Sequence, residues 1–330
     1  MRGSDSNRLD STALFVLGTI AFANLVVFPL HRNFLIPADL YGHYPAILHP
    51  YREYFSKSRD LHKLVIGIES SAPTRSLPTS GQLFCFVETS EKYYKDRVPA
   101  VAATWLPRCD NGRFFSKSPL PDRRMPYSTV FKNLEDSYYD LFRKTFFAFY
   151  YSYTFISNDF DWYLKTDDDS YIVMDHLKEY LDTLDPSEPL YLGYRLKPFL
   201  EQGYNAGGAG YILSRAAVKL FVNHLYLDEE RCPYDWAEDR GIGRCLASMG
   251  VFPEDTRDEH GLHRFNMFHP NEIAAVHPGY HFYPLKDGTS ISKKFVSLHR
   301  ISPDRMLFLD SLLYPSSGNR SFNMEFLRLL

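Results

Sequence analysis

The sequence predicts a mixed α/β domain, and three observations lead to that class. After residue 80, short apolar runs typical of strands alternate with longer stretches typical of helices. The chain has 330 residues, 45 % of them hydrophobic and 23 % charged, which is enough for one α/β domain with a sizeable core. Three consecutive aspartates, Asp167 to Asp169, directly follow one apolar run. We therefore expect an α/β sandwich around a largely parallel sheet, with the triplet beyond the carboxyl end of a strand, where ligands bind.

The predicted elements follow one another along the chain. Apolar runs predict strands over 83–87, 113–115, 160–165, 190–194 and 210–213, and a further apolar run covers 295–299. Helical patterns cover 93–105, 137–155, 174–184, 214–225 and 239–249, with Ser214 as the N-cap of the fourth.

Residues 11–30 carry no charge and predict a membrane anchor. Twenty helical residues reach about 30 Å, the thickness of a bilayer core. Arg2 and Arg8 precede the segment, which favours a cytoplasmic tail over 1–10. Residues 31–80 then read as a stem and 81–330 as a lumenal domain. A cleavable signal peptide ending near Ala23 is the alternative.

Charge and cysteine content narrow the function classes. The formal net charge of −3 argues against a nucleic-acid partner, which needs a basic face. The four cysteines contain no CxxC pair and fit disulfides of the secretory lumen, with three connectivities open. Asn319 begins a glycosylation sequon, which such a compartment would permit.

The aspartate triplet predicts a divalent cation site. Carboxylates that end a buried strand must meet water or a cation, since unpaired buried charge is costly. Oxygen ligands suit Mg²⁺ or Mn²⁺, ions that commonly share their coordination with substrate phosphates. An EF-hand loop is excluded, because Ile172 stands where that loop needs glycine. A solvated turn is the alternative for any acidic run.

Three further features carry candidate chemistry, each with a structural alternative. Residues 203–210 are glycine-rich without forming a GxGxxG motif, so they indicate close backbone approach to a ligand or a tight turn. Glu238 and Asp239 begin a predicted helix, where the helix dipole alone would favour them. His299 ends the apolar run 295–299 and could equally be a core residue.

These segments together resemble one known family. The motifs are residues 85–89, 103–105, 108–110, 161–171, 197–199, 203–211, 238–239 and 255–258. In this order they are similar to the Fringe-like β-1,3-glycosyltransferases, and nearest to their core 1 β-1,3-galactosyltransferase branch. The resemblance covers residues 81 to 310.

The resemblance implies a GT-A fold, a UDP-sugar donor and Mn²⁺. It also implies a single-pass type II Golgi membrane protein, and a homodimer is compatible with it. It also implies residue roles. Asp167, Asp169 and His299 would hold the metal. Thr89, Asp168, Gly207, Gly208 and Ala209 would line the donor site, and Tyr204 and Tyr283 the acceptor site. The implied disulfides are Cys85–Cys109 and Cys232–Cys245.

The implied reaction is inverting transfer of galactose from UDP-galactose to the 3-hydroxyl of O-linked GalNAc on glycoproteins. One carboxylate must accept the acceptor's proton; we assign Asp239, with Glu238 as the alternative. The family's core 1 members carry tryptophans and a Cys-Cys pair where this chain has residues 280–288 without either. Transfer of another sugar, such as GlcNAc, and a non-catalytic chaperone-like relative are therefore alternatives, although the retained Asp167–Asp169, Asp239 and His299 argue against the latter.

Overall fold

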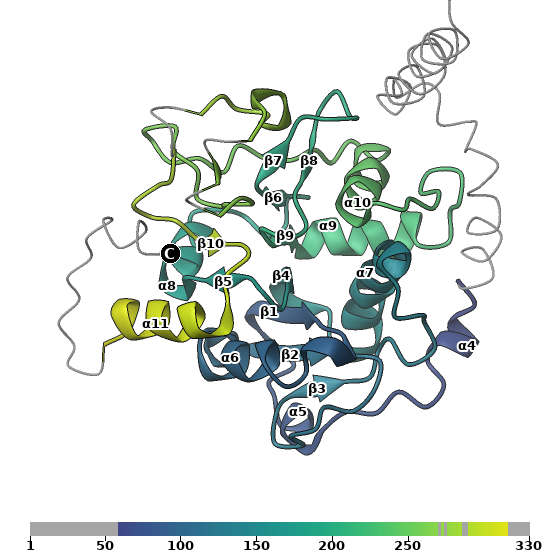
Figure 1. Cartoon of the computed structure of the whole chain (residues 1–330). Helices are drawn as coiled ribbons and strands as arrows, with labels where there is room; N and C mark the ends of the chain where they lie inside the picture. The colour runs from purple at the N-terminus through teal and green to yellow at the C-terminus, as the bar shows by residue number, and fades with distance from the viewer. Residues whose placement is uncertain (1–58, 270–271, 274–275, 286–289, 316–330) are drawn as a thin grey trace, which may run out of the picture. The chain divides into compact units, whose positions relative to one another are not determined.

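The computed structural model describes residues 59–269, 272–273, 276–285 and 290–315, all of which belong to one unit spanning 45–330 (Figure 1). The predicted tail, the predicted anchor over 11–30, the first part of the predicted stem and Asn319 lie outside these residues. Among the described residues, no helix is both long and apolar enough to cross a membrane.

A six-stranded mixed sheet forms the centre of the fold, in the order β3-β2-β1-β4-β9-β6. The strands are β1 (Ser80–Glu88), β2 (Asn111–Phe115), β3 (Tyr127–Ser128), β4 (Asp159–Asp167), β6 (Tyr191–Gly193) and β9 (Tyr211–Ser214). Strands β1 to β4 pair in parallel, but β9 runs antiparallel to both β4 and β6. The expectation of a largely parallel sheet therefore needs correction at β9, whose direction apolar patterning does not encode.

Helices cover both faces of this sheet, which makes three layers. Figure 1 shows α6 (Arg97–Ala103), α8 (Met174–Leu181) and α11 (Pro303–Leu313) together on one side of the strands. On the other side lie α7 (Leu141–Tyr151), α9 (Arg215–Leu220) and α10 (Glu238–Ala247). Single π-helical turns extend α7 over Ser152–Ile156 and α9 over Phe221–Leu225. As expected, the Ser214 hydroxyl caps α9 by accepting from the Ala217 N–H.

Two apolar clusters, one on each face, hold the layers together. Successive side chains of a strand point to opposite faces, so Cys85 and Val87 of β1 join the cluster under α6, α8 and α11. Phe84 and Phe86 join the aromatic cluster under α7, α9 and α10. The Phe86 ring stacks on Phe115 at 5.1 Å between centroids. The continuous apolar runs read from the sequence thus reflect strands buried on both faces.

Part of the predicted stem packs onto this core. Residues 59–79 include the short helices α4 (Leu61–Leu64) and α5 (Ala72–Arg75), with Leu64 and Thr74 buried. The Ser71 N–H donates to the Tyr127 carbonyl of β3 at 3.0 Å. The packed part of the chain therefore begins ahead of the boundary expected at residue 81.

Two small sheets complete the fold at the carboxyl ends of the central strands. Strand β5 (Tyr171–Ile172) pairs antiparallel with β10 (Ser297–Leu298). Strand β7 (Arg195–Leu196) pairs antiparallel with β8 (Tyr204–Asn205). These short pairings bring distant parts of the sequence to the edge where β1 and β4 end.

Candidate active site

The aspartate triplet lies at the carboxyl end of the central strands, as its position in the sequence predicts. Strands β1 and β4 are parallel neighbours, and their register pairs Glu88 with Asp167 at their last residues. Thr89 follows β1 directly, so it reaches the same edge as Asp168. The Thr89 hydroxyl donates to Asp168 Oδ2 at 2.7 Å.

The pairing of β5 with β10 brings His299 to the triplet. Its register sets Leu298 opposite Tyr171, so His299 arrives opposite the turn that contains Asp169. The Ile301 N–H donates to the Asp169 carbonyl at 2.9 Å and fixes the chain after the histidine. An antiparallel pair of only four residues, Tyr171–Ile172 and Ser297–Leu298, thus joins two segments that lie far apart in the sequence.

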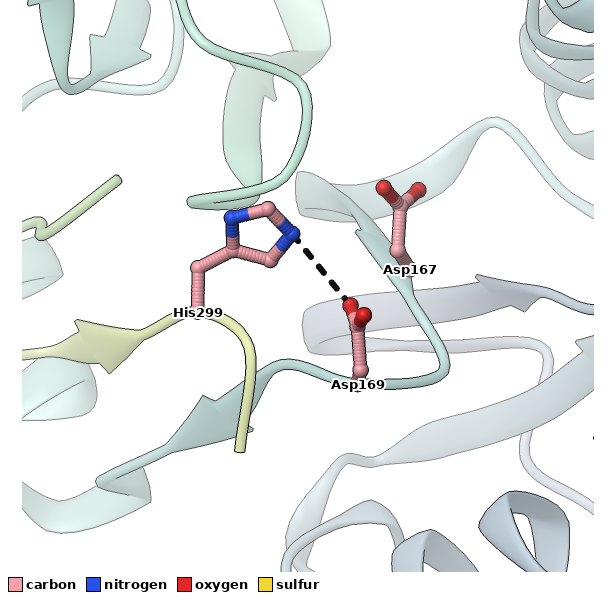
Figure 2. A group of neighbouring side chains, drawn as sticks. All are labelled: Asp167, Asp169 and His299. Carbon is pink, nitrogen blue, oxygen red and sulfur yellow. Dashed lines mark ion pairs between the residues drawn. The ribbon is translucent and has the colours of Figure 1, made fainter. Parts of the chain in front are cut away.

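Asp167, Asp169 and His299 form one cluster. One ligand atom from each lies within 4.8 Å of the others. Figure 2 shows the His299 ring turned toward Asp169, with Asp167 beside them, and the His299 Nε2 lies 3.3 Å from Asp169 Oδ1. The His299 Nδ1 lies 2.9 Å from the Met267 carbonyl, which can only accept, so this nitrogen carries the proton and Nε2 faces the carboxylates.

This cluster fits a divalent cation on two observations. Asp169 Oδ1 is buried and has no hydrogen bond in the part of the chain that the structure describes; its neighbour is the His299 Nε2 at 3.3 Å, and a cation shared by these two atoms would stabilise the pair. Two carboxylates and one imidazole also form a donor set suited to Mn²⁺ and related ions. The Met267 carbonyl supplies the outer contact that commonly orients a ligating histidine.

Arg97 is a site residue that sequence reasoning missed. Its Nη1 donates to Asp168 Oδ1 at 2.9 Å and to Asp169 Oδ2 at 3.0 Å, while its guanidinium lies over the Tyr93 ring at 3.7 Å. Burial raises the pKa of Asp168 to about 6 even though Arg97 and Thr89 oppose the shift. Burial also acts to raise the pKa of Asp169, but the contacts with His299 and the charge of Arg97 outweigh it and lower that pKa. The sequence showed Arg97 only as one residue of a predicted helix.

The glycine loop lies directly against the metal cluster. A Cβ added to Gly208 would come closer than 3.0 Å to three atoms of the His299 ring, so only glycine allows this approach. The Ser170 hydroxyl donates to the Gly208 carbonyl at 2.7 Å and joins the loop to the turn of the triplet. Ala209, the next residue, is fully buried. Gly207 faces the start of α10, because its Cβ would meet the Glu238 carboxylate.

Glu238 and Asp239 begin α10 at the same edge, but their surroundings differ. Glu238 is buried, with Oε1 accepting from the Tyr211 hydroxyl at 2.6 Å and Oε2 lying 3.5 Å from the Lys165 Nζ. Asp239 is partly exposed, and it accepts from the N–H groups of Arg240 at 2.8 Å and Gly207 at 3.3 Å. Burial raises the pKa of Glu238 to about 7 and raises that of Asp239 as well.

The two tyrosines expected at the acceptor site lie at the small sheet of β7 and β8, one on a strand and one beside it. Tyr204 lies on β8, is buried, and packs against α10 at Gly243. Tyr283 follows a segment that pairs with β7, where the Phe282 N–H donates to the Arg195 carbonyl at 3.3 Å. The Tyr283 hydroxyl accepts from Arg195 at 3.2 Å, and Arg257 lies over its ring at 3.7 Å.

Both disulfides join the pairs that the resemblance implied. Cys85 of β1 is bonded to Cys109, and Cys232 is bonded to Cys245 of α10. The second bond ties the segment before α10 to that helix, and the first two residues of the helix are Glu238 and Asp239. No free cysteine occurs in the part of the chain that the structure describes.

Comparison with known proteins agrees with this arrangement. A family model described as Fringe-like matches residues 79–281, more than half of the chain. The chain belongs to the Fringe-like family. The glycoprotein-N-acetylgalactosamine 3-beta-galactosyltransferase 1 of Xenopus laevis is 30 % identical over 74 % of this chain and 70 % of its own length.

Other relatives of this chain have different named activities. The chondroitin sulfate synthase 3 of Mus musculus is 30 % identical over 69 % of this chain, which covers only 30 % of that protein. A beta-1,3-glucosyltransferase of Mus musculus is 27 % identical over 63 % of this chain and 41 % of its own length. The chain thus spans less than half of these two relatives. The family and the mixed α/β fold establish a glycosyltransferase relationship, with a galactosyltransferase as a relative over most of the chain.

Proposed function

We propose that the protein is an inverting β-1,3-galactosyltransferase that moves galactose from UDP-galactose to the 3-hydroxyl of O-linked GalNAc on serine or threonine of glycoproteins. The observation that carries the proposal is the Asp167–Asp169–His299 cluster at the strand edge shared with Asp239. The galactosyltransferase relative, similar over 74 % of this chain, supports the choice of sugar and acceptor. The same relationship supports a Golgi membrane protein with a lumenal catalytic domain.

The donor side of this proposal rests on the metal cluster and its neighbours. Asp167, Asp169 and His299 would hold Mn²⁺, which when bound neutralises the negative charge of the departing diphosphate. Asp168, held by Thr89 and Arg97, lies beside the cluster and can accept from the hydroxyls of the donor. Gly208 against His299 lets the backbone form a close wall on the sugar side of the site.

The acceptor side rests on the carboxylates at the start of α10. Inversion requires the acceptor hydroxyl to attack the anomeric carbon from the side opposite UDP, while a base takes its proton. Asp239 suits this role better than Glu238, because Asp239 is partly exposed and its carboxylate has no ion pair with any of the described residues. Glu238 is buried, with Tyr211 and Lys165 at its two oxygens.

The test is a transfer assay with the purified full-length protein in the presence of Mn²⁺. UDP-galactose, UDP-GlcNAc and UDP-glucose are each offered with a peptide that carries O-linked GalNAc and, separately, with acceptors that carry other sugars. The proposal expects galactose transfer to the GalNAc 3-hydroxyl. Transfer of another sugar would keep the assignment as a glycosyltransferase but contradict UDP-galactose as the donor. Transfer of galactose only to a different acceptor would contradict O-linked GalNAc as the acceptor. No transfer to any acceptor would reject the enzyme itself.

A further inference from the structure

A buried lysine lies between the metal cluster and the start of α10. Lys165 of β4 is 2 % exposed, and its Nζ lies 2.7 Å from Asp167 Oδ1 and 3.5 Å from Glu238 Oε2. Its ammonium also lies directly below the glycine loop, since a Cβ on Gly207 would be 3.5 Å from Nζ. The Lys165 side chain thus links Asp167, at the end of its own strand, with Glu238, the first residue of α10.

The surroundings of Lys165 contain more acid than base. Glu88, the register partner of Asp167, is buried nearby, and its Oε2 has no hydrogen-bond partner among the described residues. Its other oxygen accepts from the Thr145 hydroxyl at 2.7 Å. Lys165 is therefore the cation placed among Glu88, Asp167 and Glu238.

A buried ammonium is a poor choice for stability alone. Removing a charge from water is costly, and an apolar side chain of similar volume commonly stabilises a strand at least as well as a buried ion pair. The neighbours of Lys165 on β4, Leu164 and Tyr163, are fully buried hydrophobic residues of the two core clusters. Lys165 instead lies between Asp167 and Glu238, two carboxylates of the candidate site, where its charge can hold them in place.

We propose that Lys165 is a positioning residue, which holds one oxygen each of Asp167 and Glu238 and so fixes the metal-binding strand end relative to the start of α10. This inference rests on the proposed function for its catalytic consequence, but its effect on metal binding does not depend on any acceptor. Asp167 Oδ1 accepts from Lys165, which leaves Oδ2 and the second lone pair of Oδ1 available to a cation.

The test compares Lys165→Met and Lys165→Arg in the full-length protein with Lys144→Met as the matched control. Lys144 of α7 is another buried lysine, ion-paired with Asp136 and 5.5 Å from the Phe131 ring. Among the described residues it has no ion pair with the site carboxylates. Mn²⁺ affinity is measured by calorimetry in the absence of substrate, and kcat and acceptor KM are measured separately. Thermal melting checks that each variant is folded.

The proposal expects Lys165→Met to weaken Mn²⁺ binding by about 10- to 100-fold, the usual effect of removing a residue that orients a metal ligand. It expects Lys165→Arg to recover part of that loss and Lys144→Met to bind Mn²⁺ as the wild type does. In the double variant Lys165→Met with Asp167→Asn, the losses should be less than multiplicative, since both changes break the same contact.

A folded Lys165→Met protein with wild-type Mn²⁺ affinity would overturn the proposal, and so would an equal loss in Lys144→Met. If Lys165→Met does not fold, Lys165→Gln, which keeps a polar donor without the charge, carries the same comparison. A wild-type protein that binds Mn²⁺ but transfers no sugar would reject the proposed function, while the Mn²⁺ affinities would still decide the role of Lys165.

Discussion

Gly208 shows how a single backbone position sets the metal cluster. A side chain there would overlap the His299 ring, and that ring is held from its other side by the Met267 carbonyl. We predict that Gly208→Ala displaces His299 and weakens Mn²⁺ binding by roughly tenfold or more. Gly279→Ala, at an exposed turn, is the control. Calorimetry with Mn²⁺ checks this, and an unchanged affinity in Gly208→Ala would show that His299 is not a ligand.

Asp239 carries the second prediction at the residue scale. Asp239→Asn keeps the size of the side chain and one acceptor oxygen for the N–H groups of Gly207 and Arg240, but its amide cannot take a proton. We expect kcat to fall by about 100- to 10,000-fold while the dissociation constant for UDP-galactose stays unchanged. Glu238→Gln is the comparison, with a smaller loss. If the two variants exchanged these effects, the base would be Glu238.

The pH dependence of turnover gives a third prediction. A general base works only when deprotonated, so kcat should fall as the pH drops through the pKa of that carboxyl group. Burial raises the pKa of Asp239, so this acid limb should lie above the range of an ordinary aspartate. The measurement is kcat at saturating substrates from acid to neutral pH. A limb centred at about 7, the pKa that burial gives Glu238, and absent in Glu238→Gln would assign the base to Glu238.

At the scale of elements, the disulfide before α10 determines how firmly the base is held. The Cys232–Cys245 bond closes a segment with a separation of 13 residues that contains Glu238 and Asp239. Replacing both cysteines by alanine should lower the free energy of unfolding by about 3 kcal/mol, mainly because the unfolded chain becomes less restricted. Urea unfolding measures this. A loss near zero would mean that packing of α10 alone positions these carboxylates.

Most elements could be predicted because their apolar pattern is local. The buried runs that became β1, β4 and β9 and the Ser214 cap were all evident from neighbouring residues. The direction of β9 could not be predicted, because an apolar run has the same pattern whether the strand pairs in parallel or antiparallel. The predicted helix over 93–105 begins later, at Arg97, after a 3₁₀ turn. Element ends depend on caps and tertiary contacts that a periodic pattern does not contain.

At the scale of the whole molecule, the candidate site was predictable where motifs carried it. The triplet, the glycine loop, the carboxylates of α10 and His299 were all identified, and the structure brings them to one edge of the sheet. Arg97 and Lys165 were not identified, because a basic residue inside a helix or strand pattern has many structural uses. Only tertiary contact shows that both face the aspartates.

The acceptor side has the least support from sequence, and the structure shows why. His281 forms an isolated bridge with Leu196 of β7, and Arg195 and Arg257 pack on the rings of Phe282 and Tyr283. The guanidinium groups lie 3.6 and 3.7 Å from those rings, so cation–π contacts stabilise this segment. If Tyr204 and Tyr283 line the acceptor site as predicted, we expect this segment to set the acceptor preference.

The central claim is that Asp167, Asp169 and His299 hold a divalent cation that binds the diphosphate of the donor. Titration of UDP into the full-length protein, with Mn²⁺ and with a chelator, tests it most directly. We predict that the wild-type protein binds UDP in the presence of Mn²⁺ and does not bind it in the presence of the chelator. We predict that the Asp169→Asn variant does not bind UDP in either condition. UDP binding of equal affinity without Mn²⁺, or in Asp169→Asn, would contradict the claim.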